Sequence, residues 1–188
     1  SNGGIASVVK AYHFAHKSGS YSYKMYLLKT NFYKDKGMAY EIFIFISAIL
    51  KSIYFSIFCN IGLFHIHSSA RRSFYRKAFF VMLAKILNKK IIFHIHASDF
   101  YSFFLKDSRF ISFILGTSDC VVVLCSDWRR VLVEKYPKLH IVKVENPFDI
   151  PLISRANSYD KQLKFKVVFV GFLIQSKGIR DLLLLAKK

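Results

Sequence analysis

Residues 91–99 read Ile-Ile-Phe-His-Ile-His-Ala-Ser-Asp, an apolar run that ends in two histidines, small residues and an acid. A buried parallel strand presents polar groups at its carboxyl end in this way. Residues 62–69 nearly repeat the pattern as Gly-Leu-Phe-His-Ile-His-Ser-Ser, and Phe64 and Phe93 are 29 residues apart. This interval is close to the roughly 30-residue repeat of a strand–helix–strand unit. The repeat predicts two parallel neighbouring strands whose His-Ile-His ends lie side by side at one edge of a sheet, where open α/β sheets bind ligands.

The rest of the chain alternates strand patterns with helix patterns. Apolar alternation or β-branched runs predict strands at residues 20–30, 62–69, 91–96, 120–125, 141–144 and 165–170. Apolar residues at helical spacing predict helices at residues 5–17, 41–58, 70–88, 100–115, 128–136 and 179–188. This alternation predicts an α/β protein with a Rossmann-like, doubly wound parallel sheet.

A break in the pattern near residue 150 predicts two domains. Residues 147–160 contain two prolines, Asn, Ser and Asp without sustained periodicity, which is typical of a linker. We expect residues 1–150 to form an N-terminal Rossmann-like domain, residues 151–164 a linker, and residues 165–188 the incomplete beginning of a second such domain. The chain has no initial Met, no strand before Gly3, and ends at Lys188 inside a helix pattern, which favours a fragment cut at both ends.

The formal charge of +18 is large for 188 residues and is unevenly distributed. No acid occurs between Glu41 and Asp99, and many bases fall in that interval. They include Arg71, Arg72, Arg76, Lys77, Lys85, Lys89 and Lys90. A solvated basic helix face is one interpretation, and a field that attracts anionic lipid or phosphorylated ligands is the other. Because no nucleic-acid reader motif accompanies the bases, we expect no nucleic-acid partner.

Residues 41–58 are apolar on nearly every side, and Lys51 is the sole formal charge from Ile42 to His65. A transmembrane span is conceivable, but Lys51 would then lie near the bilayer centre. We expect instead a buried or membrane-facing helix of the α/β domain. Lysines and arginines beside apolar helices are typical of a peripheral face that binds an anionic membrane surface.

The cysteines indicate a reducing compartment. Cys59, Cys120 and Cys125 are odd in number and none belongs to a Cys-x-x-Cys pair. This usage is typical of reduced thiols in a cytosolic protein, not of disulfides or a zinc knuckle.

Two glycines and four histidines are candidates for ligand binding. Gly3 and Gly4 open a helix pattern, where free backbone N–H groups form a candidate cradle for phosphate or sugar, with a simple loop as the alternative. The histidines form two i, i+2 pairs on strands predicted to be adjacent, an arrangement that could bind zinc. They are His65, His67, His94 and His96.

The spacing after the second pair argues against a metal enzyme. The run from His96 to Asp99 is one residue too long for the commonest hydrolase signature. We expect no metal, and we expect structural roles for His65 and His94. A metal-dependent hydrolase that uses the paired strand ends stays open as an alternative.

Four stretches of the chain together resemble the family-4 retaining glycosyltransferases of the GT-B fold. They are Gly-Gly-Ile-Ala at 3–6, Phe-His-Ile-His-Ala-Ser-Asp-Phe at 93–100, Ile-Val-Lys-Val-Glu-Asn-Pro-Phe-Asp at 141–149, and Val-Phe-Val-Gly-Phe-Leu at 168–173 with Lys-Gly-Ile at 177–179. Their order and spacing match over nearly the whole chain. Bacterial members that build surface polysaccharide, such as lipopolysaccharide, are the most similar.

The resemblance implies two Rossmann-like domains that face each other across a cleft, with the acceptor on the N-terminal domain and a nucleotide-sugar donor on the C-terminal domain. It implies that His96 lies at the reacting sugar as a catalytic residue, with Asp99 close by. It assigns donor binding to Gly3, Gly4, Ser98, Asn146, Gly171 and Lys177. Lys177 would pair with the nucleotide diphosphate, which suits a flexible point charge near a glycine-containing loop.

The chain departs from the family pattern in two places. Phe172 stands where the family commonly has an arginine that binds the diphosphate. The later pair of glutamates that handles the donor sugar would lie beyond Lys188. We therefore expect this fragment alone to be inactive.

The implied activity is retaining transfer of a sugar from a nucleotide-sugar to a lipid-linked or saccharide acceptor. It would take place in the cytoplasm, at the inner face of the cell membrane, without a metal or other cofactor. The chain shows no paired carboxylates of the glycosidase type, so hydrolysis by two acids is not expected. Besides the metal-dependent hydrolase, a non-catalytic basic domain that binds anions or a membrane surface is an alternative.

Overall fold

The computed structural model describes residues 4–19, 22–30, 37–97, 99–106, 108–147, 169, 175 and 178–185. The chain divides into two compact units, residues 1–149 and 150–188. In the second unit the described helix is α7 (Ile179–Leu185). The expected linker and all but residue 169 of the expected strand 165–170 lie outside the described residues. The assignment of the second unit to a nucleotide-sugar-binding domain stays a prediction.

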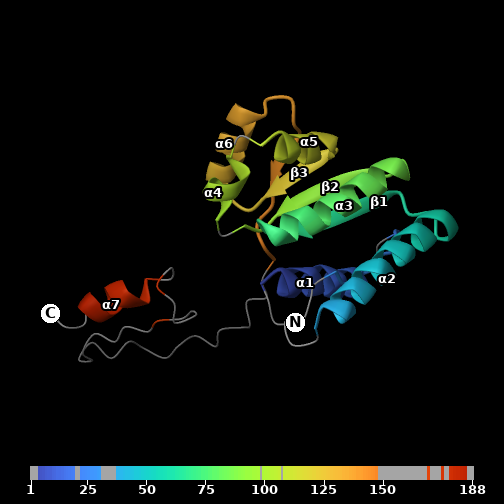
Figure 1. Ribbon diagram of the computed structural model, residues 1–188, viewed down its shortest axis with the longest axis horizontal. Coiled ribbons are helices and arrows are strands. Elements are labelled where there is room, and N and C mark those ends of the chain that lie inside the picture. Colours follow the sequence, from blue (N-terminus) through green and yellow to red (C-terminus); the bar gives the residue numbers. More distant parts are fainter. Residues whose placement is uncertain are drawn as a thin grey trace. The chain divides into compact units, whose positions relative to one another are not determined.

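The first unit contains an open, all-parallel sheet of four strands (Figure 1). The strands lie in the order β1 (Leu63–Ser68), β2 (Lys90–Ile95), β3 (Cys120–Val123) and β4 (Ile141–Lys143). The connections are α3 (Arg72–Ile86), then α4 (Phe100–Phe104) with α5 (Arg109–Thr117), then α6 (Ser126–Lys135). The α/β class and the parallel sheet expected from the alternating patterns are confirmed, and the sheet is compatible with a Rossmann-like fold.

One face of the sheet packs against α3. Phe93 of β2 is fully buried and meets Phe74 of α3 edge to face, with ring centres 5.7 Å apart. Phe104 of α4 also lies against Phe74, at 5.5 Å. Each such buried phenylalanine contributes about 1.5–3 kcal/mol through burial alone. These contacts fix the helix on β1 and β2 and bury the residues of β2 that alternate with its histidines.

The opposite face of β1 is met by α1 (Gly4–Ser18). Tyr12 of α1 lies 6.0 Å from the ring of His65 and 5.9 Å from that of His67. Helix α1 therefore covers part of this face of β1, where His67 is half-buried and His65 remains exposed.

The strand expected at residues 20–30 is wrong for the part that the structure describes. Residues 22–30 have no regular secondary structure, although Tyr26 packs on Phe55, with ring centres 4.4 Å apart. The alternation of Tyr23, Met25 and Leu27 does not mark a buried side of the segment, since Tyr23 and Leu27 are exposed and the consecutive residues 23–27 line a cavity beside β1.

Helix α2 (Gly37–Phe58) differs from an ordinary core helix, because the residues that it buries are small. Its buried residues are Ala48, Ser52 and Ser56. The Ser52 hydroxyl donates to the Ala48 carbonyl at 2.8 Å, and the Ser56 hydroxyl donates to the Ser52 carbonyl at 2.7 Å. Both buried hydroxyls therefore have hydrogen-bond partners within the helix. Phe45 and Ile49 of α2 pack against the core, but many of its large side chains are exposed: Met38, Ile42, Phe43, Ile46, Leu50, Tyr54, Ile57 and Phe58.

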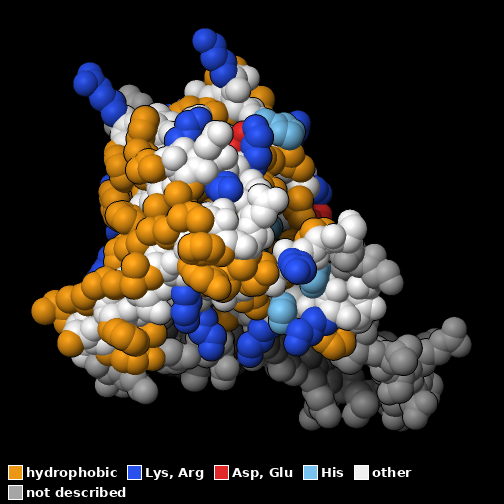
Figure 2. Space-filling view, turned by 90° about the vertical axis from the view of Figure 1, so that its right-hand side faces the viewer, with side chains coloured by type: hydrophobic (Ala, Val, Ile, Leu, Met, Phe, Trp, Pro, Cys, Tyr) orange, Lys and Arg blue, Asp and Glu red, His pale blue; other side chains and the backbone are white. Residues whose placement is uncertain are grey.

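Among the described residues, α2 is the one helix long and apolar enough to cross a membrane by length and composition. The hydrophobic side chains on the face drawn in Figure 2 form a broad patch with Lys and Arg side chains at its margin. The sequence did not distinguish a buried α2 from a membrane-facing one. The structure shows that most of the apolar surface of α2 is uncovered within the described chain.

Candidate functional site

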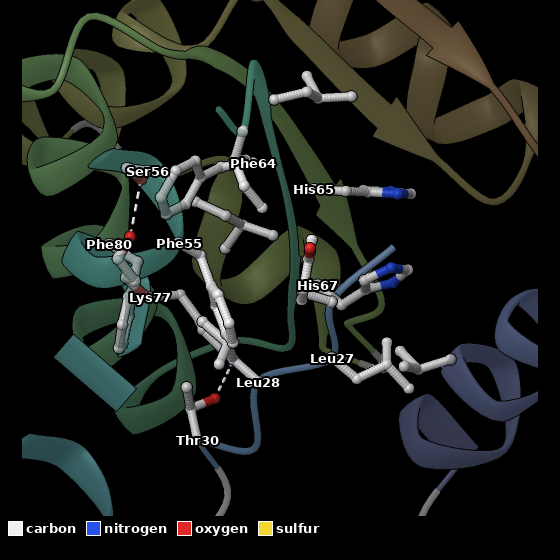
Figure 3. Close-up of a pocket in the computed structure, with 16 residues that line it drawn as sticks. Leu27, Leu28, Thr30, Phe55, Ser56, Phe64, His65, His67, Lys77 and Phe80 are labelled. Carbon is white, nitrogen blue, oxygen red and sulfur yellow. Dashed lines mark hydrogen bonds between the residues drawn. The ribbon is translucent and has the colours of Figure 1, made fainter. Parts of the chain in front are cut away.

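Four histidines gather on one face of β1 and β2, and we call His65, His67, His94 and His96 the histidine cluster. The strand register pairs His67 with His94. Because side chains alternate along a strand, the four histidines point to the same side of the sheet. Figure 3 shows His65 and His67 on one side of β1 and Phe64 on the other. The neighbouring His-Ile-His ends predicted from the sequence repeat are confirmed.

Two hydrogen bonds connect the cluster across the strands. His65 Nε2 and His94 Nδ1 are 3.3 Å apart, and His67 Nδ1 and His96 Nε2 are 2.9 Å apart. In each pair one imidazole must donate its N–H to the unprotonated nitrogen of the other. The pairs are themselves in contact, since the ring centres of His65 and His67 are 4.2 Å apart and those of His94 and His96 are 4.1 Å apart.

Burial keeps the imidazoles uncharged. It lowers the pKa of His65, and it lowers the pKa of His94 to about 3 and that of His96 to about 4, with smaller contributions from neighbouring imidazoles. The pKa of His67 falls to about 2, first through burial and then through the other three histidines and Lys77. All four rings are therefore neutral at neutral pH, and each has a lone pair that can accept a hydrogen bond or bind a metal ion.

His94 is the most enclosed member of the cluster. Its side chain is 0% exposed, and its Nε2 atom has no hydrogen-bond partner among the described residues. An unpaired buried nitrogen costs about 1–3 kcal/mol. Retaining such a group in place of an apolar side chain is typical of a functional site.

Two cavities border the cluster on the outer side of β1. The larger, of about 810 Å³, is lined by Tyr12, His65, His67 and parts of residues 23–27 and 59–63. The smaller, of about 160 Å³, also reaches His65 and His67 and extends to Lys77 and Thr30 (Figure 3). The cluster is therefore accessible from the side of β1 although its inner members are buried.

Lys77 is a cavity residue that the sequence did not single out. Its ammonium donates to the Thr30 hydroxyl, and burial, followed by the nearby Arg76, lowers its pKa to about 8. By the charge pattern alone, Lys77 belongs with the bases that are either solvated or attract anions. One feature of the sequence could have indicated that Lys77 is buried. It lies three residues after Phe74, on the apolar stripe of α3.

The two predicted catalytic residues have different partners. His96 follows β2 directly and bonds to His67, so it belongs to the cluster. Asp99 precedes α4, and its carboxylate accepts a 2.8 Å hydrogen bond from Arg71 Nε in an exposed ion pair. Arg71 has a φ of 56°, a conformation that costs a non-glycine residue about 1–3 kcal/mol. The carboxyl edge of β1 and β2 thus carries both the neutral cluster and a strained, charged pair.

Two of the predicted donor-binding residues are described. Gly4 is the first residue of α1, and a Cβ added there would meet no atom within 4 Å, so packing does not require glycine. Asn146 follows β4, two strands away from β2, at the same carboxyl edge of the sheet. Gly3, Ser98, Gly171 and Lys177 lie outside the described residues.

No protein-family model, curated protein or solved structure matches the chain. The likeness to glycosyltransferases therefore rests on the residues of the chain itself.

Proposed function

We propose that the chain is the acceptor-side domain, with a segment of the donor-side domain, of a retaining glycosyltransferase of the GT-B type that builds bacterial surface polysaccharide. The observation that carries the proposal is the position of His96. It follows the central strand β2 of a parallel sheet at the carboxyl edge, where open α/β sheets bind ligands. Its neutral ring is held by a hydrogen bond to His67.

The charge state of His96 suits an acceptor or donor hydroxyl group. In the transfer, the bond between the anomeric carbon and the diphosphate oxygen breaks, the acceptor oxygen forms the new bond, and the acceptor's proton passes to the departing diphosphate oxygen. A neutral imidazole can hydrogen-bond to a sugar hydroxyl or orient the acceptor without adding positive charge beside the developing oxocarbenium carbon. Asp99, held by Arg71, would lie near the rim of the same site.

Other residues of the chain are proposed to stabilise the negative charge of the leaving group. Departure of the nucleoside diphosphate builds negative charge, which Lys177 and the glycine-rich opening of α1 at Gly3 and Gly4 would stabilise. Asn146 and Gly171 complete the proposed donor contacts. No metal ion is assigned to the transfer itself.

The experiment is a transfer assay on the full-length protein that contains this chain. Purified protein is incubated with a panel of nucleotide-sugars and with lipid-linked or oligosaccharide acceptors, with and without a chelator. We expect nucleoside diphosphate release that depends on the acceptor, yields a product with retained anomeric configuration and persists with chelator. Release without acceptor that is lost with chelator would favour the metal-dependent hydrolase instead.

We propose further that the exposed face of α2 attaches the protein to an anionic membrane surface, at the cytoplasmic side, where a lipid-linked acceptor would be presented. The face spans a 22-residue helix, and its apolar side chains are largely uncovered among the described residues. Lys51 lies on the same helix, and no acid occurs from residue 42 to residue 98. An apolar face within a basic region complements anionic lipid head groups above hydrocarbon.

Replacement of Phe43 by aspartate should weaken vesicle binding by at least about tenfold, because burial of a phenylalanine is worth about 1.5–3 kcal/mol. Phe43 is 66% exposed, so the change should not disturb folding. The matched control is Phe113→Asp on α5, which also replaces an exposed phenylalanine (53%). Flotation with neutral and anionic vesicles, at low and high salt, measures the effect. Equal loss in both variants, or binding indifferent to lipid charge and salt, would contradict the proposal.

A further inference from the structure

The histidine cluster contains three ligand nitrogens that approach one another closely enough to share one ion. One ring nitrogen from each of His65, His67 and His94 lies within 4.8 Å of the other two. Their ring centres are 4.2 Å, 4.9 Å and 5.4 Å apart. These rings come from two adjacent strands of a parallel sheet, so a rigid backbone positions them.

We propose that His65, His67 and His94 form a binding site for a divalent transition-metal ion of the zinc class, with His96 as the residue that orients His67. The site is additional to the proposed glycosyl transfer and does not depend on it. It assigns binding only, with no reaction attached to the ion.

The separation between the strands fits tetrahedral coordination. Zinc binds imidazole nitrogen at about 2.0–2.1 Å, which places two nitrogens of a tetrahedral site about 3.3 Å apart. His65 Nε2 and His94 Nδ1 are already 3.3 Å apart. His67 lies directly opposite His94 in the strand register, and one of its ring nitrogens lies within 4.8 Å of those of His65 and His94.

His96 supplies the outer contact that metal-binding histidines ordinarily have. A histidine ligand usually donates its second ring N–H to a nearby acceptor, which fixes its tautomer and orientation. His67 Nδ1 is 2.9 Å from His96 Nε2, so His67 can donate this proton and keep Nε2 free for the ion. His96 therefore acts on the ion through His67 and is not itself a ligand.

The surroundings favour a soft, nitrogen-binding divalent ion and leave it a path to the site. Burial lowers the pKa of all three ligand residues, so no proton competes for their lone pairs at neutral pH. Imidazole ligands select zinc, copper, nickel or cobalt over magnesium or calcium, which prefer oxygen. The cavity of about 810 Å³ reaches His65 and His67 and leaves a fourth position for water.

The test uses the untagged 188-residue chain, because a polyhistidine tag would bind the same ions. The chain is stripped with chelator, dialysed and titrated with Zn²⁺ by calorimetry and with Co²⁺ by visible absorption. We expect one ion per chain and a Co²⁺ spectrum with the intensity of a tetrahedral site. Absence of stoichiometric binding at micromolar free metal would overturn the proposal.

Variants separate the proposed site from surface histidines. His65→Gln removes a ligand on the open side of the cluster and should abolish Co²⁺ absorption with circular dichroism unchanged. His96→Gln should weaken binding by about 10–100-fold, as expected for a residue outside the coordination sphere. His140→Gln changes an exposed loop histidine and should have no effect. Retained affinity in His65→Gln, or equal loss in His140→Gln, would also overturn it.

Discussion

Replacement of His96 by alanine in the full-length protein should reduce kcat for glycosyl transfer by about 10²-fold, the loss that misplacement of a reacting group by about 1 Å can cause. The folded state should be largely retained, because His96 follows the last residue of β2 and is only half-buried. The variant loses one hydrogen bond, to His67, with a net value of about 0.5–1.5 kcal/mol.

The control is His65→Ala, which removes a histidine of the same cluster further from the strand end. It also loses one hydrogen bond, to His94, so its effect on stability should match that of His96→Ala, and it should keep transfer activity. Steady-state kinetics in the presence of chelator, with thermal unfolding of each variant, measures both effects. Loss of transfer in His65→Ala with retention in His96→Ala would reverse the assignment of the catalytic residue.

Acidification should unfold the N-terminal unit well above the pH at which carboxylates alone would cause it. His94 and His96 have pKa values of about 3 and about 4 in the folded protein, below the ordinary value of 6.5. The unfolded chain therefore binds more protons below about pH 6.5, and stability falls as pH decreases from there toward the folded values. Each unit by which the pKa of a group differs between the folded and unfolded states corresponds to about 1.4 kcal/mol in the free energy of unfolding. By about pH 4, a buried histidine thus lowers the free energy of unfolding by on the order of 3 kcal/mol. This is a large part of the roughly 5–15 kcal/mol typical of a domain.

The measurement is urea unfolding in the presence of chelator across this pH range. Trp128 is the chain's one tryptophan and stacks on Phe100 at 4.6 Å, so its fluorescence reports on the first unit. His94→Gln removes one titrating group and should flatten the pH dependence, whereas His140→Gln should leave it unchanged. A stability that is constant from pH 7 to pH 4, or an unaltered profile in His94→Gln, would show that the cluster does not control acid sensitivity.

The sequence by itself determined the parallel pairing of β1 and β2. A hydrophobic run of strand length, an intervening helix pattern and the repeat of about 30 residues leave a right-handed crossover between neighbouring strands as the favoured arrangement. The same alternation placed the four histidines on one face. These properties depend on residues that are close together in the sequence, so the hydrophobic periodicity predicts them directly.

Only the tertiary structure decided which groups the histidines meet and which way α2 faces. The bond from His67 to His96, the contact with Tyr12 and the cavity position of Lys77 join segments separated by up to tens of residues. Burial, and hence the lowered pKa values, depends on how these segments pack. Helix α2 is apolar on nearly all sides, so its pattern could not indicate the inward face. Close packing selected the small side chains of Ala48, Ser52 and Ser56 for that face.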